Sequence, residues 1–216
     1  MLFFPPAREL IVFVSAATLL LVIPGPAVLY ILARSMDQGR TAGLASAAGT
    51  AVGTLVHVAA ATLGLSALLI SSALAYSAVK YAGACYLFYL GIKKFRERPG
   101  KHSNDHACDH PIPVGKVFGQ GVVVNILNPK TAIFFFAFLP QFVSPTRGHV
   151  SVQFLALGMT FAVMGYISDS MWALSAGSAA HWLRRKKRFV NNERYVAGTV
   201  YMGLGLATAV GANRHK

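Results

Sequence analysis

Long apolar segments alternate with short polar stretches along this chain. Between Arg40 and Lys80 there is no Asp, Glu, Lys or Arg, and at roughly 20 residues for each crossing this stretch holds nearly two membrane spans. The hydrophobic pattern predicts six spans, at residues 9–33, 42–63, 74–93, 117–143, 150–178 and 195–211. We therefore expect an all-α membrane protein with six transmembrane helices.

Two of these spans, the first and the fourth, are interrupted by proline. The breaks consist of Pro24, Gly25 and Pro26 in the first span and of Asn128, Pro129 and Lys130 in the fourth. A broken helix in a bilayer leaves backbone groups that only protein or a wet cavity can satisfy, so a matching pair of breaks points to a transporter's binding site. We predict that these six residues, together with Asn125, contact the substrate. A kink that serves only helix packing is the alternative.

The two breaks also bring groups that suit an anion. A helix that restarts after Pro26 presents N–H groups without intrahelical acceptors, and these favour a carboxylate. Lys130 adds an ammonium, which could meet a substrate carboxylate or the side chain of Asp169. It could instead extend along its aliphatic stem to a membrane interface.

Asp169 is the only acidic residue in the interior of a predicted span. A carboxylate at membrane depth costs at least about 2.5–3.5 kcal/mol on insertion scales, so it is usually paired or functional. We predict that Asp169 carries the proton in a coupled transport cycle. His57, its counterpart when the two halves are aligned, is predicted as a second proton-coupling residue. For each of them a hydrogen-bonded role in packing is the alternative.

The two halves of the chain resemble each other in the same order. The matched pairs are Pro24 with Pro129, 53–57 with 165–169, and 82–86 with 197–201. Three spans in each half is an odd number, which requires the second half to be inverted in the membrane. We therefore expect a 3+3 inverted repeat: residues 1–95 and 116–216, joined by a His-rich cytoplasmic loop at 96–115. Chance similarity between spans rich in Gly, Ala and Tyr is the alternative.

Charge supports the same arrangement. Only 12% of the residues are charged, against roughly 25% in soluble domains. The formal net charge is +13, and with alternating spans five basic residues fall on one side and fourteen on the other, with Lys130 inside a span. The positive-inside rule places the basic side in the cytoplasm and both termini outside. The run Arg184–Arg188 then predicts a contact with anionic lipid rather than with nucleic acid.

Two further features leave alternatives open. The loop residues His102, His106, Cys108 and His110 are weak candidates for a metal site, although their spacing matches no standard zinc pattern. Gly49 and Gly53 form a GxxxG element, which favours close helix packing within the chain or between two copies of a homo-oligomer. The sequence holds no nucleotide-binding or hydrolase motif, and we expect no cofactor and no enzymatic activity.

Several motifs together resemble those of one transporter family. They are 24–30, 38–44 and 49–57 in the first half, 81–87 and 90–92 in the third span, and 125–130 and 139–143 in the fourth. In this order they are similar to the lysine exporter/homoserine-threonine resistance (LysE/RhtB) family, over roughly residues 5–212. The resemblance implies six spans and proton-driven efflux of amino acids across a bacterial inner membrane. Thr54 stands where many members of that family carry Asp, so the resemblance implies no carboxylate role in the second span.

The leading hypothesis is thus a proton-coupled exporter of a neutral or basic amino acid, of the threonine/homoserine, leucine or lysine class. A divalent-metal exporter that uses the His-rich loop is the first alternative. A membrane-embedded enzyme is the second, and the absence of another embedded carboxylate or of a nucleophile–base pair counts against it.

Overall fold

The computed structural model describes residues 5–65 and 112–176, together with eight single helical positions: Tyr81, Cys85, Tyr89, Ile92, Arg96, Thr199, Met202 and Leu206. Within these residues every regular element is a helix and no strand occurs. The all-α prediction is confirmed to that extent. Most of the predicted third and sixth spans, residues 97–111 of the loop, and Arg184–Arg188 lie outside the described residues.

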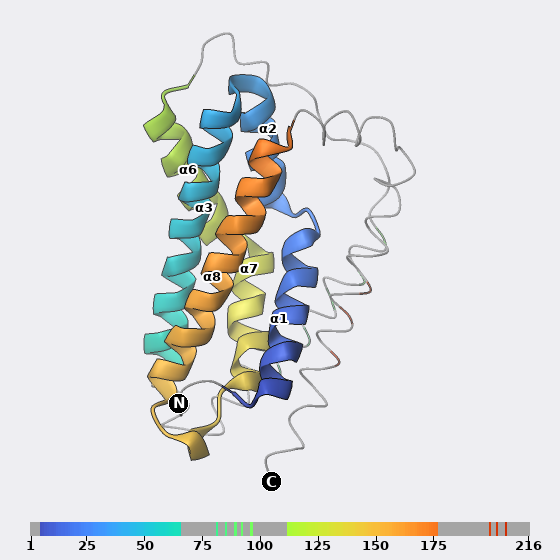
Figure 1. Cartoon of the computed structure of the whole chain (residues 1–216), viewed down its shortest axis with the longest axis vertical. Helices are drawn as coiled ribbons and strands as arrows, with labels where there is room; N and C mark the ends of the chain where they lie inside the picture. The colour runs from blue at the N-terminus through green and yellow to red at the C-terminus, as the bar shows by residue number, and fades with distance from the viewer. Residues whose placement is uncertain are drawn as a thin grey trace.

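The helices of the first half are α1 (Ala7–Val22), α2 (Pro26–Gln38) and α3 (Arg40–Ala60), and a π-helical turn at Ala61–Leu65 continues α3. Those of the second half are α6 (Val114–Ile126), α7 (Pro129–Ile133) and α8 (Val150–Leu174). A π-helical turn at Phe134–Phe138 and 3-10 turns at Leu139–Phe142 and Pro145–Arg147 follow α7. Figure 1 shows these elements side by side as a bundle with its long axis vertical.

Two helices are long and apolar enough to cross a membrane alone, namely α8 and α3 with its π-helical turn. Two bent pairs pass the same test, which gives up to four spans in the described part of the chain. The axis turns by 48° between α1 and α2, and by 46° between α6 and the helix that runs from Pro129 to Phe142. The predicted breaks in the first and fourth spans are therefore confirmed.

The local sequence explains both breaks. At the first, α1 ends at Val22, Gly25 is extended (φ −114°, ψ −172°), and α2 begins at Pro26. Proline fits this first helical position because its missing N–H would have no acceptor there. At the second, Asn128 is the N-cap of α7, and its side-chain oxygen accepts a hydrogen bond from the Lys130 amide at 3.1 Å. Pro129 fills the same first position in α7.

Helix α3 packs against α6 with its backbone in close contact, because both helices present glycine at the crossing. A Cβ atom at Gly49 would lie 2.2 Å from the Phe118 carbonyl oxygen, and one at Gly53 would lie 2.8 Å from that of Val122. From the other side, a Cβ at Gly121 would lie 2.7 Å from the Ser46 carbonyl oxygen. The GxxxG element thus serves packing within the chain, and the alternative of a face between two copies does not hold.

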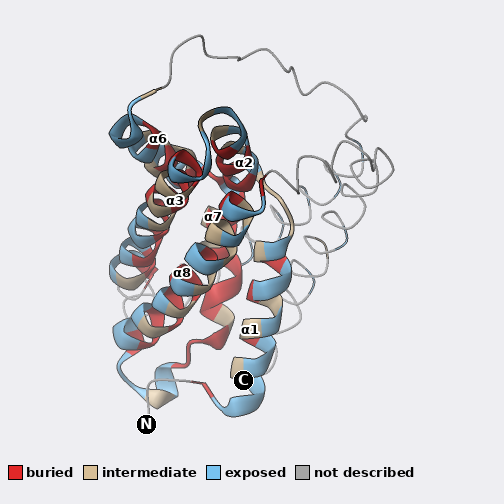
Figure 2. Cartoon of the chain, turned by 45° about the horizontal axis from the view of Figure 1, so that its top comes forward, coloured by how far each residue is buried: buried red, intermediate tan, exposed pale blue. Residues whose placement is uncertain are grey.

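The core is aromatic and lies around α7 and the turns that follow it, where the ribbon in Figure 2 is red for buried residues. Fully buried phenylalanines from α1, the π-helical turn and α8 meet there: Phe13, Phe134, Phe135 and Phe154. The outer surface is apolar as well. Exposed side chains on α8 include Leu155, Met159, Val163, Ile167 and Met171. A helix that is apolar all round suits a membrane span better than the surface of a water-soluble protein.

Candidate functional site

The two helix breaks meet in space. The Lys130 ammonium, at the start of α7, donates a hydrogen bond of 2.5 Å to the carbonyl oxygen of Ile23, just after the end of α1. Gly25 lies against the stem of the same side chain, since a Cβ there would be 3.0 Å from Lys130 Cδ. A cation at a helix C-terminus is favourable because the last carbonyl groups carry partial negative charge. Lys130 therefore links the two breaks, and only 8% of its surface is exposed.

A small cavity of about 30 Å³ lies between the breaks. Its polar lining comes from five elements or their ends, and consists of Gly25, Thr54, Asn125, Asn128, Lys130, Thr131 and Asp169. Its apolar lining consists of Leu20, Leu21, Ala27, Val28, Phe161 and Gly165. The volume suits a water molecule or two, so the space is far smaller than an amino acid.

Asp169, half-buried on α8, reaches α3 through the hydroxyl group of Thr50. The Thr50 Oγ1 atom lies 2.8 Å from Asp169 Oδ2 and 2.9 Å from the Ala47 carbonyl oxygen. A hydroxyl group has one proton to donate. It can give that proton to a carboxylate at Asp169, or give it to Ala47 and accept the proton of a neutral carboxylic acid. Both protonation states of Asp169 thus have a hydrogen-bond partner at Thr50.

Asn125 organises the polar side of the cavity. Its amide nitrogen donates to the Thr50 carbonyl oxygen at 2.7 Å and to Thr54 Oγ1 at 2.8 Å. Its side-chain oxygen accepts from Thr131 Oγ1 at 3.0 Å and from Asn128 Nδ2 at 3.3 Å. One buried amide therefore ties α3 to both sides of the second break, with two donors and two acceptor positions in use.

His57 lies outside this lining. Its Nε2 atom is 3.1 Å from the Asn125 carbonyl oxygen, and its ring stacks on Phe135 with centroids 5.9 Å apart. An imidazole N–H at this position donates to a carbonyl group near the end of α6 that also accepts from the Asn128 amide at 3.1 Å. The structure thus places His57 behind the cavity wall, next to the network but not facing the space between the breaks.

The predicted site residues divide into three sets. Gly25, Asn125, Asn128, Lys130 and Asp169 line the cavity together. Pro24, Pro26 and Pro129 shape the breaks without lining it, and His57 contacts the network from outside. The weak metal candidates His102, His106, Cys108 and His110 lie outside the described residues, and within the described ranges no three His, Cys, Asp or Glu side chains gather.

Sequence reasoning missed three threonines of the network: Thr50, Thr54 and Thr131. A signal for two of them was present. Along the apolar helix α3 the polar side chains recur every three or four residues, at Ser46, Thr50, Thr54 and His57, and all four are buried. Such a spacing puts them on one face of the helix, and that face is the one that turns toward the cavity and α6.

Comparison with known proteins agrees with this architecture. The chain is 30% identical over 202 residues to an uncharacterized membrane protein of Pseudomonas aeruginosa, which covers 91% of this chain and 94% of the relative. It is 29% identical over 186 residues to an uncharacterized membrane protein of Vibrio cholerae, covering 86% and 89%. It is 26% identical over 197 residues to the leucine efflux protein of Salmonella typhimurium, covering 91% and 92%. No solved structure gives a significant match.

The sequence profile of the LysE type translocators matches residues 18–211, which is most of the chain. This match spans both helix breaks and every residue that lines the cavity. It confirms the resemblance that the sequence motifs indicated, and it identifies the chain as a translocator. The chain belongs to the LysE type translocator family.

Proposed function

We propose that this transporter exports an amino acid and that the cavity between the helix breaks is its substrate site. One observation carries the proposal: an ammonium, a carboxyl group and two carboxamides converge on that cavity, at membrane depth, where both broken spans meet. Relatives named leucine efflux proteins support the substrate class. A bacterial inner membrane is the expected location.

The lining fits the two ends of an amino acid. The substrate carboxylate would lie near Lys130 and the first N–H groups of α2, at Ala27 and Val28, which have no acceptor within the helix. The substrate ammonium would lie toward Asp169 and the side-chain oxygen atoms of the asparagines. The apolar part of the wall would take the side chain, with Leu20, Leu21 and Phe161 nearest to it. An amino acid with a neutral aliphatic side chain fits this apolar wall better than one with a positively charged side chain.

Binding requires the cavity to open, because about 30 Å³ is too small for any amino acid. The contact between Lys130 and the Ile23 carbonyl is the natural place for this change. A substrate carboxylate is a stronger acceptor for an ammonium than a neutral carbonyl, so its arrival would exchange one partner of Lys130 for another. The breaks would then separate on one side of the membrane at a time.

We infer that Asp169 couples this cycle to protons, since both its protonation states have a partner at Thr50. We also infer the 3+3 inverted repeat, with residues 1–95 and 116–216 as its halves. Two similar bends, of 48° and 46°, at the prolines that align between the halves support the repeat.

Transport in inside-out membrane vesicles tests the proposal. Vesicles with the full chain are given an imposed proton gradient and labelled leucine, threonine or lysine, and in parallel Ni²⁺ or Zn²⁺. Concentrative uptake of leucine, kept when residues 102–110 are deleted, is the expected result. Uptake of metal that disappears with this deletion, without uptake of any amino acid, would overturn it. Vesicles with Lys130→Gln provide the matched control for uptake through the cavity.

A further inference from the structure

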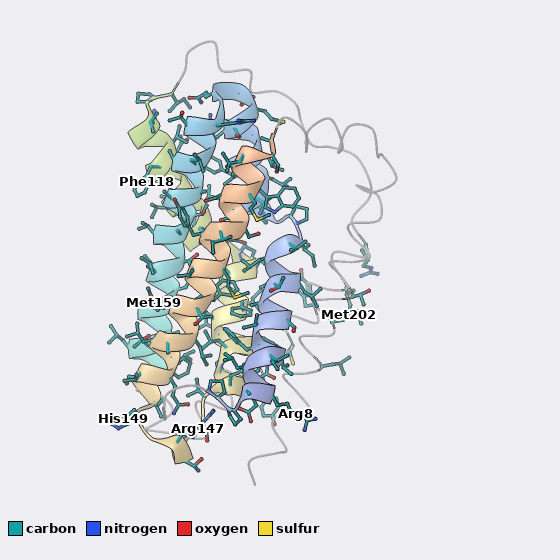
Figure 3. The ribbon with its side chains drawn as sticks, in the orientation of Figure 1. Arg8, Phe118, Arg147, His149, Met159 and Met202 are labelled. Atoms are coloured by element: carbon teal, nitrogen blue, oxygen red, sulfur yellow. The ribbon has the colours of Figure 1, made fainter. Side chains whose placement is uncertain are left out.

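A second hollow, separate from the cavity, lies between α2 and α6. It is an open groove of about 620 Å³, lined by Tyr30 and Arg34 from α2 and by Lys116, Gly119, Gln120, Val123 and Val124 from α6. In Figure 1 the C-terminal end of α2 and the N-terminal end of α6 lie at the upper end of the bundle. Arg8, Arg147 and His149 lie at the opposite end in Figure 3. By the charge distribution, the upper end is the predicted cytoplasmic one.

The groove carries two positive charges without a carboxylate partner among the described residues. The Arg34 guanidinium lies 5.5 Å from the centre of the Tyr30 ring and donates to Gln120 Oε1 at 3.3 Å. Tyr30 in turn donates to the Val117 carbonyl oxygen at 2.8 Å, which fixes the ring. These neutral partners orient Arg34 and leave its charge uncompensated. Lys116 is exposed at the mouth of the groove.

Two other features of the groove also favour an anion with an apolar tail. Lys116 lies in the first turn of α6, where the aligned peptide dipoles of the helix give partial positive charge. Farther along α6, Val123 is 55% exposed and extends the groove as an apolar wall toward the middle of the membrane. At Gly119 no atom lies within 4 Å of the position that a Cβ would occupy, so the groove is open there.

We propose that this groove binds an anionic phospholipid, with the phosphate group between Arg34 and Lys116 and an acyl chain along Val123 and Val124. Basic pockets between membrane helices are suited to such headgroups. A free anion would use the charges but not the apolar wall, and a neutral lipid would use the wall but not the charges. The residues of this groove are other than those of the basic run Arg184–Arg188, which the sequence indicated for lipid contact.

The test counts lipids retained by the purified full chain in neutral detergent, using native mass spectrometry with phosphatidylglycerol or phosphatidylcholine. Retention of one phosphatidylglycerol in preference to phosphatidylcholine is expected. The double variant Arg34→Gln/Lys116→Gln should weaken this binding by roughly fivefold for each charge removed. Arg40→Gln is the matched control, because Arg40 is exposed at the same end of the bundle but does not line the groove.

A second variant separates the groove from general surface charge. Gly119→Leu keeps both cations and places a side chain in the open space, so phosphatidylglycerol should be lost while the thermal midpoint stays the same or rises. Wild-type retention by Gly119→Leu would overturn the proposal. So would an equal loss in Arg40→Gln, or displacement of phosphatidylglycerol by millimolar inorganic phosphate, since these results would point to surface charge or to a free anion.

Discussion

Asp169 and Lys130 approach one small cavity from different helices, and each is tied to the other half of the protein. Asp169 on α8 pairs with Thr50 on α3, and Lys130 on α7 pairs with the carbonyl of Ile23. Each pair joins residues separated by more than one hundred positions in the sequence. Charged groups at membrane depth are costly unless paired in this way. These contacts could also change during transport: a proton could bind to Asp169, and a substrate carboxylate could replace the Ile23 carbonyl at Lys130.

The first prediction concerns Asp169→Asn. Asparagine keeps the shape and an oxygen that can accept from Thr50, so folding and membrane insertion should be normal. It cannot take up a proton, so leucine accumulation driven by a proton gradient should fall to background. Exchange of labelled for unlabelled leucine at equal pH, measured in the same vesicles, should survive. Accumulation against a gradient by this variant would make Asp169 a packing residue, and His57 would be tested next.

The second prediction concerns Gly25→Ala. Alanine can adopt the extended backbone of this position (φ −114°), so the effect is steric and not conformational. Its Cβ would lie 3.0 Å from Lys130 Cδ and would push the stem away from the contact with Ile23. Since a hydrogen bond from a charged group contributes about 1.5–3 kcal/mol, export should slow by roughly tenfold or more. Gly115→Ala, where the added methyl meets open space, should export at the wild-type rate.

At the scale of elements, the approach of α3 to α6 decides the stability of the bundle. The third prediction is that Gly49→Ala destabilises the folded protein by about 1–3 kcal/mol or more, the usual cost of overpacking. The added methyl would meet the Phe118 carbonyl, which is backbone and cannot turn away. Unfolding in detergent, followed by helical circular dichroism, measures the change. Gly119→Ala, on the open side of α6, should unfold at the same point or later.

The sequence predicted the elements more completely than the contacts between them. Proline at 24, 26 and 129 located both breaks, because proline in the interior of a helix removes a hydrogen bond and clashes with the preceding turn. The π-helical turn at Phe134–Phe138 left no such mark in an apolar run. Asn125 was predicted as a substrate contact, but its four partners come from α3 and from the start of α7. Which threonine contacts Asn125 depends on how the helices are rotated about their axes, and residue spacing along one helix does not determine that rotation.

At the scale of the whole molecule, contacts at both ends of the described bundle hold the two broken spans together. Contacts between α2 and α6, including Tyr30 with Val117, join the two broken spans at one end. At the other end Arg147 donates to the Phe142 carbonyl and lies 3.7 Å from a carboxylate oxygen of Glu9 on α1. The cavity between these ends has room for a water molecule or two, which is less space than an amino acid needs.

The fourth prediction concerns the direction in which this bundle crosses the membrane. Arg34, Arg40 and Lys116 belong to the end of α2 and the starts of α3 and α6, which lie at the upper end of the bundle in Figure 1. Arg8, Arg147 and His149 are labelled at the opposite end in Figure 3. This distribution agrees with the one predicted from the sequence, in which alternating spans place fourteen basic residues on one side of the membrane and five on the other. The richer end should face the cytoplasm because basic loops are retained there.

Fusions at residue 216 and within the loop 97–111 test this direction. A phosphatase reporter that is active only outside should be active at the C-terminus and silent in the loop, and a fluorescent reporter that folds only inside should give the reverse. Replacing Arg34, Arg40 and Lys116 with Gln in the same fusions should weaken the preference for this orientation, since these positive charges contribute to it. Fluorescence from the C-terminal fusion of the unmodified chain would contradict the orientation with both termini outside.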